Sequence, residues 1–296
     1  MEYMWSSIGR VSPSIGFIMT LACAAAGASA DVVEIEASKD NTLYEDVAGT
    51  LSNGAGDHFF VGVTAMDFIR RGLLAFDVSA VPEGSTITSV TLTLNMSQTI
   101  VGPQTIELHR ASADWGEGAS HAKGQEGGGA DALLGDATWL HTFFDTDFWT
   151  TPGGDFNPVA SGSTVVDFNG PYTWDSTPEM VADVQDWLDD PSINFGWILT
   201  GDETTLPTAK RFDTRENPLP NTNPLLTVEF TISIECEGDA NGDGTVDPLD
   251  SGYVLARFGC PVGTGDPSCD AADQNGDGAV DPLDSGFVLA RFGPCP

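Results

Sequence analysis

Two copies of one acidic segment, residues 239–259 and 273–293, constrain this chain more than any other feature. The copies are identical except at three positions, where Ala240, Thr245 and Tyr253 are replaced by Gln274, Ala279 and Phe287. Each copy starts with a 12-residue stretch that carries Asp or Asn at positions 1, 3, 5, 9 and 12 and glycine at position 6. A calcium-binding loop needs side-chain oxygens at those positions, a carbonyl at position 7 and a sharp turn at the glycine. The repeat therefore predicts two bound Ca²⁺ ions.

The predicted ligands follow from this loop numbering. In the first loop they are the side chains of Asp239, Asn241, Asp243, Asp247 and Asp250 and the carbonyl of Thr245. In the second loop they are the side chains of Asp273, Asn275, Asp277, Asp281 and Asp284 and the carbonyl of Ala279. The carboxylates of one loop repel each other without a cation, and Ca²⁺ fits such a loop better than Mg²⁺, which keeps its waters. The alternative, a pair of metal-free acidic turns, is disfavoured because both copies of the pattern are complete.

A helix is expected after each loop. Asp247-Pro248 and Asp281-Pro282 each place an N-capping side chain before a proline at the first helical position. The partly apolar segments that follow run to Gly259 and Gly293, which are expected to end the helices as C-caps. Aspartate at loop position 9 then has two possible roles, as a direct ligand or as a helix cap that reaches the ion only through water.

Four cysteines lie close to the two loops: Cys236, Cys260, Cys269 and Cys295. An even number in a small exported module predicts two disulfides. Pairing Cys236 with Cys295 and Cys260 with Cys269 would tie the ends of the module together. Pairing Cys236 with Cys260 and Cys269 with Cys295 would staple each repeat separately, and the sequence does not choose between these arrangements. A zinc site is disfavoured because this region has no CxxC motif and no histidine.

Residues 237–293 resemble a type I dockerin, the module that attaches secreted proteins to cohesin domains in polysaccharide-degrading assemblies. The resemblance implies calcium binding and a cohesin-type partner for a small α-helical module, which we place at residues 235–296. The chain departs from the family at loop positions 10 and 11, which are Pro-Leu in both copies, and in its four cysteines. The alternative is a self-contained cap or anchor whose fold is held together by calcium.

The N-terminus predicts export. Arg10 is followed by an apolar stretch at residues 15–28 and by Ala28-Ser29-Ala30, a cleavage pattern of small residues, so residues 1–30 are predicted to be a signal peptide. A lipoprotein signal ending at Cys23 is the alternative. We expect a secreted, extracellular or cell-surface protein without a membrane span, since no other stretch is long and apolar enough to cross a bilayer. The net charge of −33 repels nucleic acids.

Residues 31–234 are predicted to form an all-β sandwich. Short runs rich in Val, Thr, Ile and Phe recur between turn residues, and Val90, Leu92, Leu94 and Met96 alternate with polar residues as in a half-buried strand. One helix is expected at residues 176–190. Its Trp187 lies on the apolar face and is expected to belong to the core.

The order of these segments resembles the DNRLRE-domain family of secreted bacterial proteins. The stretches that carry the resemblance include "RRGLLAFDVSAVPEGSTITSVTLTL", "ELHRASADWGEG" and "VADVQDWLDDPSINFGWIL". The resemblance implies a jelly-roll-like sandwich, and some members of the family bind polysaccharide. The namesake hexapeptide is absent, and "DNTL" at residues 40–43 is its nearest counterpart.

Carbohydrate binding would need exposed flat aromatic rings beside polar groups. The aromatic segment at residues 137–156 and its polar setting make Trp149 the first candidate, with Trp174 and Trp139 after it. Asp114 and Glu117 are the nearest pair of acids that could suit a glycosidase, but the sequence does not single them out, and the four histidines show no zinc-ligand spacing.

These features favour a non-catalytic protein that binds a polysaccharide, a cell-surface glycan or another extracellular surface. The alternatives are a polysaccharide-active hydrolase or lyase and a structural cell-surface protein.

Overall fold

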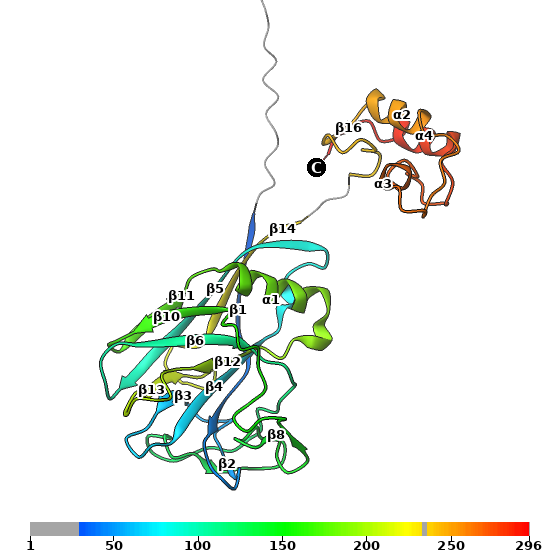
Figure 1. Cartoon of the computed structure of the whole chain (residues 1–296). Coiled ribbons are helices and arrows are strands. Elements are labelled where there is room, and N and C mark those ends of the chain that lie inside the picture. Colours follow the sequence, from blue (N-terminus) through cyan, green and yellow to red (C-terminus); the bar gives the residue numbers. More distant parts are fainter. Residues whose placement is uncertain (1–29, 233–235, 296) are drawn as a thin grey trace, which may run out of the picture. The chain divides into compact units, whose positions relative to one another are not determined.

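The computed structural model describes residues 30–232 and 236–295, so the signal peptide predicted over residues 1–30 lies outside the described residues apart from Ala30. The described chain divides between Cys236 and Glu237 into two compact units. The first unit is mostly β-structure, as the sequence predicts, and the second contains short helices (Figure 1).

The first unit has one α-helix, two 3-10 turns and many antiparallel strands. Its helical elements are η1 (Val78–Ala80), α1 (Pro178–Asp189) and η2 (Pro191–Ile193). Its strands are β1 (Asp31–Tyr44), β2 (Leu51–Ser52), β3 (His58–Val63), β4 (Ile69–Phe76), β5 (Ser85–Thr99), β6 (Gln104–Arg110), β7 (Ala130–Asp131), β8 (His141–Phe143), β9 (Asp147–Phe148), β10 (Gly162–Val166), β11 (Gly170–Trp174), β12 (Trp197–Thr200), β13 (Lys210–Asp213) and β14 (Leu225–Ile232). Among the residues that the structure describes, no helix has the length and hydrophobicity needed to cross a membrane.

The strands form two sheets that share β1 and β3. One sheet contains β1, β14, β5, β13 and β3, with β11 paired to β5, and the other contains β1, β3, β4, β12, β6 and β10. In β1, residues 31–36 pair with β14 and the rest with β4, and the register shifts between Ala37 and Lys39. The shared strands connect the sheets into a sandwich that is partly closed like a barrel.

The main core joins side chains from both sheets. Val90, Leu92, Leu94 and Met96 of β5 are all fully buried in it, which confirms the alternation predicted for this strand. The helix α1 begins after the N-cap Thr177, whose hydroxyl accepts the N–H of Met180. Its apolar face joins the same core, and Trp187 is fully buried as expected.

The second sheet is also buried on its other face. Leu73 and Leu74 are neighbours on β4, so their side chains point to opposite faces, and both are fully buried. Leu74 belongs to the main core, whereas Leu73 and Ile198 belong to a second cluster. The segment between β6 and β10 covers this second cluster with Trp115, Trp139 and Trp149.

The second unit contains two loop–helix repeats that pair with each other. Its elements are β15 (Thr245–Val246), α2 (Pro248–Leu255), α3 (Pro267–Asp270), α4 (Pro282–Leu289) and β16 (Gly293–Pro294). The first loop pairs through β15 with β16, which follows the second helix. The second loop pairs in the same way with the segment after the first helix, since Gly259 N–H donates to the Val280 carbonyl at 2.9 Å.

The predicted helix starts are confirmed, but the predicted helix ends are wrong. Asp247 and Asp281 cap α2 and α4, as expected. The helices end at Leu255 and Leu289, before the glycines that were expected to cap them. The reason is tertiary, because Gly259 bonds the opposite loop instead of closing its own helix.

Candidate functional site

The first acidic loop is shaped by its own side chains. Asp239 accepts the N–H groups of Gly242 and Asp243 on Oδ1, at 2.8 and 3.1 Å, and that of Gly244 on Oδ2 at 2.8 Å. Asn241 Oδ1 accepts the N–H of Asp243 at 2.8 Å. The predicted ligands at positions 1 and 3 therefore face the inside of the loop, where they hold its backbone in a tight turn.

The second loop repeats this arrangement. Asp273 accepts the N–H of Asp277 on Oδ1 at 3.2 Å and that of Gly278 on Oδ2 at 2.9 Å. Asn275 Oδ1 accepts the N–H of Asp277 at 2.8 Å. The position-5 side chains also match, since Asp243 and Asp277 each accept the N–H two residues further on at 3.0 Å. Nearly identical sequences thus produce nearly identical hydrogen bonds.

The aspartate at position 12 links each loop to its helix. Asp250 accepts the N–H of Asn241 on Oδ1 at 3.0 Å and that of Asp247 on Oδ2 at 2.8 Å. Asp284 makes the same two contacts in the second loop, and both carboxylates are fully buried. The second contact completes a capping box with the N-cap side chain. This role of position 12 was not part of the sequence prediction.

The donor chemistry of both loops fits a hard cation. Every predicted ligand offers oxygen, and a carboxylate that accepts two or three N–H groups keeps a further lone pair for an ion. In the described part of the chain, however, neither loop brings three acidic side chains together with oxygens all within 4.8 Å of one another. The structure therefore places the predicted ligands around each loop but does not gather them at one point.

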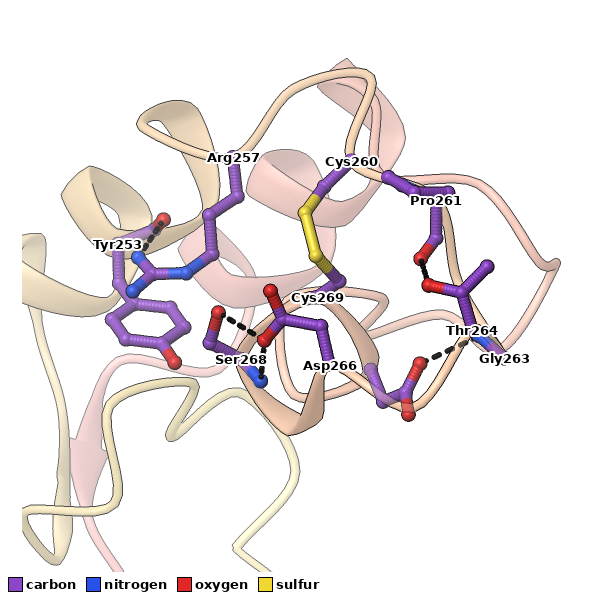
Figure 2. Close-up of a disulfide and its surroundings, with 10 residues drawn as sticks. Tyr253, Arg257, Cys260, Pro261, Gly263, Thr264, Asp266, Ser268 and Cys269 are labelled. Carbon is purple, nitrogen blue, oxygen red and sulfur yellow. Dashed lines mark hydrogen bonds between the residues drawn. A yellow bond between two sulfur atoms is a disulfide. The ribbon is translucent and has the colours of Figure 1, made fainter.

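A disulfide closes the segment between the two repeats. Cys260 is bonded to Cys269, which excludes the arrangement that pairs Cys236 with Cys260 (Figure 2). Cys236 and Cys295 are also disulfide-bonded. Asp266 caps α3 beside the bridge by accepting the N–H of Ser268 at 3.0 Å (Figure 2). The disulfide thereby fixes the connection between the first helix and the second loop.

Six apolar side chains are exposed on the second unit, three from each repeat. They are Leu249, Leu255 and Phe258 from the first repeat and Leu283, Leu289 and Phe292 from the second, between 41% and 66% exposed. Leu249 and Leu283 occupy loop position 11, where the sequence departs from the dockerin family. Exposed apolar side chains at equivalent positions of both repeats are candidates for contact with a partner.

The three tryptophans predicted to bind carbohydrate are buried, so the prediction that their rings are exposed is wrong. Trp149 and Trp139 are 5% and 8% exposed and cover the outer face of the second sheet, and Trp174 is fully buried in the main core. Their polar edges are used internally. Trp149 Nε1 donates to the Thr138 carbonyl at 2.9 Å, and Trp174 Nε1 donates to the Ile106 carbonyl at 3.0 Å.

A polar groove of about 480 Å³ lies on the outer face of the first sheet. Its polar lining comes from β1, β5 and the loop before β14, namely Glu34, Glu36, Thr93, Asn217, Asn221 and Asn223. Amide and carboxylate groups of this kind can bond sugar hydroxyls. The sequence prediction missed the groove because its residues come from three separate segments.

Asp114 and Glu117, which the sequence analysis considered as a catalytic pair, have different partners. Asp114 pairs with Lys39 at 2.9 Å. Glu117 makes a bidentate ion pair with Arg215, in which Arg215 Nε donates at 2.8 Å and Nη2 donates at 2.7 Å. Glu117 also lies beside the buried Asp40. The pair is therefore divided between two separate ion-pair networks.

No protein-family model matches the chain, and no curated protein shows detectable similarity to it. The resemblances to a type I dockerin and to a DNRLRE-type domain therefore depend on the residues quoted for them. What the structure adds is the matched hydrogen bonding of the two loops, the repeated apolar surface and the polar groove.

Proposed function

We propose that this chain is a secreted, non-catalytic protein of a polysaccharide-degrading system. Its β-rich unit binds carbohydrate or another extracellular surface, and its second unit is a calcium-dependent, dockerin-like attachment module. The observation that carries the proposal is the duplication of the acidic loop, in which both sequence and side-chain hydrogen bonding repeat. Two copies of one complete oxygen-ligand pattern favour cation binding over incidental acidity.

Each proposed Ca²⁺ ion is held by the twelve-residue loop of one repeat. The side chains at positions 1, 3, 5 and 12 and the carbonyl of Thr245 or Ala279 are the ligands, and position 9 caps the following helix. When bound, the ion supplies the positive charge that a loop with several carboxylates needs. Because position 12 also belongs to the capping box, binding at the loop stabilises the start of the helix.

The proposed partner surface consists of the six exposed apolar residues of the two repeats. A protein partner of the cohesin type would bury these side chains, and each buried leucine contributes roughly 1.5 kcal/mol or more. Leu249 and Leu283 are the strongest candidates for specificity, because they lie at the loop positions that usually select the cohesin. Their apolar nature favours a partner with an apolar rather than a hydroxyl-rich binding surface.

The proposed carbohydrate site is the polar groove and not the buried tryptophans. Its glutamates and asparagines can bond hydroxyl groups, and the acidic lining from Glu34 and Glu36 favours neutral over anionic sugars. Leu219, which is exposed at its edge, offers an apolar contact for a sugar ring.

The attachment function is tested with the full chain and an immobilised panel of cohesin-type domains. We expect retention in Ca²⁺ and release in EDTA. Leu249→Asp combined with Leu283→Asp should weaken binding about 100-fold, which corresponds to about 3 kcal/mol. Leu134→Asp, at an exposed leucine of the β-rich unit, is the control and should bind normally. The attachment proposal would be contradicted if no cohesin-type domain in the panel retained the chain, or if EDTA did not release it.

The carbohydrate function is tested by pull-down with a panel of neutral and acidic polysaccharides. We expect retention on a neutral polysaccharide that Glu34→Ala with Glu36→Ala removes, whereas Glu229→Ala on the neighbouring β14 leaves it intact. The same samples are scored for new reducing or unsaturated ends. Their appearance would favour the hydrolase or lyase alternative, and retention on no polysaccharide would favour a structural role at the cell surface.

A further inference from the structure

A second group of acidic side chains lies inside the β-rich unit, away from the duplicated loops. It consists of Asp40 on β1, Glu117 in the loop after β6, and Glu216 in the loop after β13, and each contributes an oxygen within 4.8 Å of the others. These residues come from three segments of the chain. Asp40 N–H donates to Glu117 Oε1 at 2.9 Å across 77 residues of sequence, and Arg215 N–H donates to Asp40 Oδ2 at 2.8 Å across 175 residues.

The backbone around Glu117 is fixed by close packing. A Cβ atom at Gly54 would lie 1.6 Å from the Glu117 carbonyl oxygen, so only glycine fits against it. Gly118 has φ +76°, and a Cβ there would lie 1.4 Å from Asp136 Oδ1. Asn41 Nδ2 also donates to the Glu117 carbonyl at 2.8 Å. The loop therefore holds the Glu117 side chain beside Asp40 without needing a ligand to do so.

Two carboxylate oxygens in this group have no partner. Asp40 is fully buried, and its Oδ1 has no hydrogen-bond partner among the described residues. The same is true of Glu216 Oε2, which is also inaccessible to solvent. A buried carboxylate oxygen without a donor is costly, because it loses its hydration and gains nothing in return.

Among the described residues, the cation that contacts this group is Arg215, and its charge does not balance the three acids. Arg215 contacts Glu117 through two nitrogens and Glu216 Oε1 at 2.9 Å. Its guanidinium therefore contacts both outer acids but leaves Glu216 Oε2 without a partner among the described residues, while Asp40 receives only a backbone N–H from the same residue. Three ionised carboxylates and one guanidinium carry a net charge of −2, which one divalent cation would neutralise.

We propose that Asp40, Glu117 and Glu216 bind a Ca²⁺ ion in the β-rich unit. Asp40 Oδ1 and Glu216 Oε2 supply the ligands that the fold leaves unpaired, and Glu117 adds a third carboxylate oxygen. The group opens toward solvent on one side, since the side chains of Glu117 and Glu216 are 16% and 24% exposed. Water completes the shell there. All-oxygen ligands with irregular spacing suit Ca²⁺, whereas Mg²⁺ demands a near-ideal octahedron.

This ion connects the groove to the body of the sandwich. Glu216 lies directly before the segment 217–223, which forms one wall of the polar groove. Asp40 belongs to β1, which also carries the groove residues Glu34 and Glu36. A cation held between Asp40 and Glu216 therefore ties the segment 217–223 to β1 and orders the surface that meets a ligand.

The test uses Tb³⁺, which has oxygen ligands like those of Ca²⁺, on the full chain. Tryptophan excitation favours sites in the β-rich unit, because residues 236–296 contain no tryptophan, and Trp115 lies two residues from Glu117. We expect saturable Tb³⁺ emission on tryptophan excitation that Ca²⁺ displaces. Asp40→Asn and Glu216→Gln should each lower this emission at least about tenfold, whereas Asp175→Asn, an exposed acid without a contact to the group, should not.

A second measurement separates metal binding from a structural role of the acids. Unfolding followed by tryptophan fluorescence should shift upward by roughly 5–10 °C in Ca²⁺ at about 100 times its dissociation constant. In EDTA, Asp40→Asn should unfold at or above the wild-type temperature, since it removes a buried charge, and it should lose the calcium shift. Glu216→Gln, at a partly exposed position, gives the same readout if Asp40→Asn fails to fold.

Three outcomes would overturn the proposal. The first is a wild-type chain without Tb³⁺ emission or calcium shift, as expected if Asp40 and Glu216 share a proton instead of an ion. The second is the persistence of both signals in Asp40→Asn and Glu216→Gln. The third is the loss of both signals in the double variant Asp250→Ala with Asp284→Ala, which would assign them to the duplicated loops. Failure of this site leaves the attachment proposal unaffected, because that proposal depends on the second unit.

Discussion

Asp250 is the residue at which the proposed metal loop, the helix cap and the fold of the second unit meet, so its replacement gives the sharpest test of the loop. Its carboxylate accepts two backbone N–H groups, from Asn241 at 3.0 Å and from Asp247 at 2.8 Å. A hydrogen bond to a charged group contributes about 1.5–3 kcal/mol. Asp250→Ala removes both and should cost about 3–6 kcal/mol. Asp250→Asn keeps one acceptor oxygen and should cost about half as much.

Hydrogen exchange followed by mass spectrometry of the full chain measures this effect for each loop separately. Because about 1.4 kcal/mol is a tenfold change in an equilibrium constant, Asp250→Ala should lower protection of the first loop and α2 at least about 100-fold in EDTA. Ser251→Ala is the matched control, because Ser251 is also buried and its hydroxyl has no partner among the described residues.

The second loop serves as an internal reference in the same molecule. With Ca²⁺ added, the wild-type chain should gain protection in both loops, and Asp250→Ala should keep the gain only around Asp284. Equal protection in the wild type and in Asp250→Ala, with and without Ca²⁺, would refute the reasoning. It would mean that the buried carboxylate neither holds the loop backbone nor binds the ion.

Two further predictions concern a buried acid and a disulfide. Burial raises the pKa of Asp183, which accepts hydrogen bonds from Ser161 Oγ and Trp197 Nε1. The folded state therefore binds a proton more tightly than the unfolded chain, and the stability that this group contributes is lost as pH rises from about 3.9 through the raised value. Urea unfolding followed by tryptophan fluorescence should show that loss in the wild type relative to Asp183→Asn, and parallel pH profiles would contradict it. Replacing Cys260 and Cys269 by serine opens a loop with a sequence separation of 9 and should destabilise the second unit by about 2–3 kcal/mol. Hydrogen exchange of α2 and α4 measures this, and unchanged protection would show that the bridge is dispensable.

The features that the sequence predicted correctly are those with local causes. The N-caps Asp247 and Asp281 depend on residues adjacent in the chain, and so do the buried alternation of β5 and the apolar face of α1. The helix ends were predicted wrongly because Gly259 meets Val280 of the other repeat. A glycine at the end of an apolar segment looks the same whether it caps its own helix or bonds a distant strand.

The tryptophans show the same limit more clearly. Trp149 is followed by Thr, Thr, Pro and two glycines, a local context typical of an exposed turn. The ring is buried because the second sheet has an apolar outer face, with Leu73 and Ile198, that something must cover. Whether a sheet is buried on one face or on both depends on which distant segment folds over it, and no short window of sequence contains that information.

By itself the sequence determined the two acidic loops, because their acidic side chains, turns and helix starts all lie within twelve consecutive residues. It also determined that most of the remaining chain forms strands. Only the tertiary structure decided which groups meet across long distances, such as Asp40, Glu117 and Glu216, and which rings are covered. The physical reason is that hydrogen bonds within a loop are fixed by chain spacing, whereas burial and long-range charge pairing are fixed by how the sheets pack.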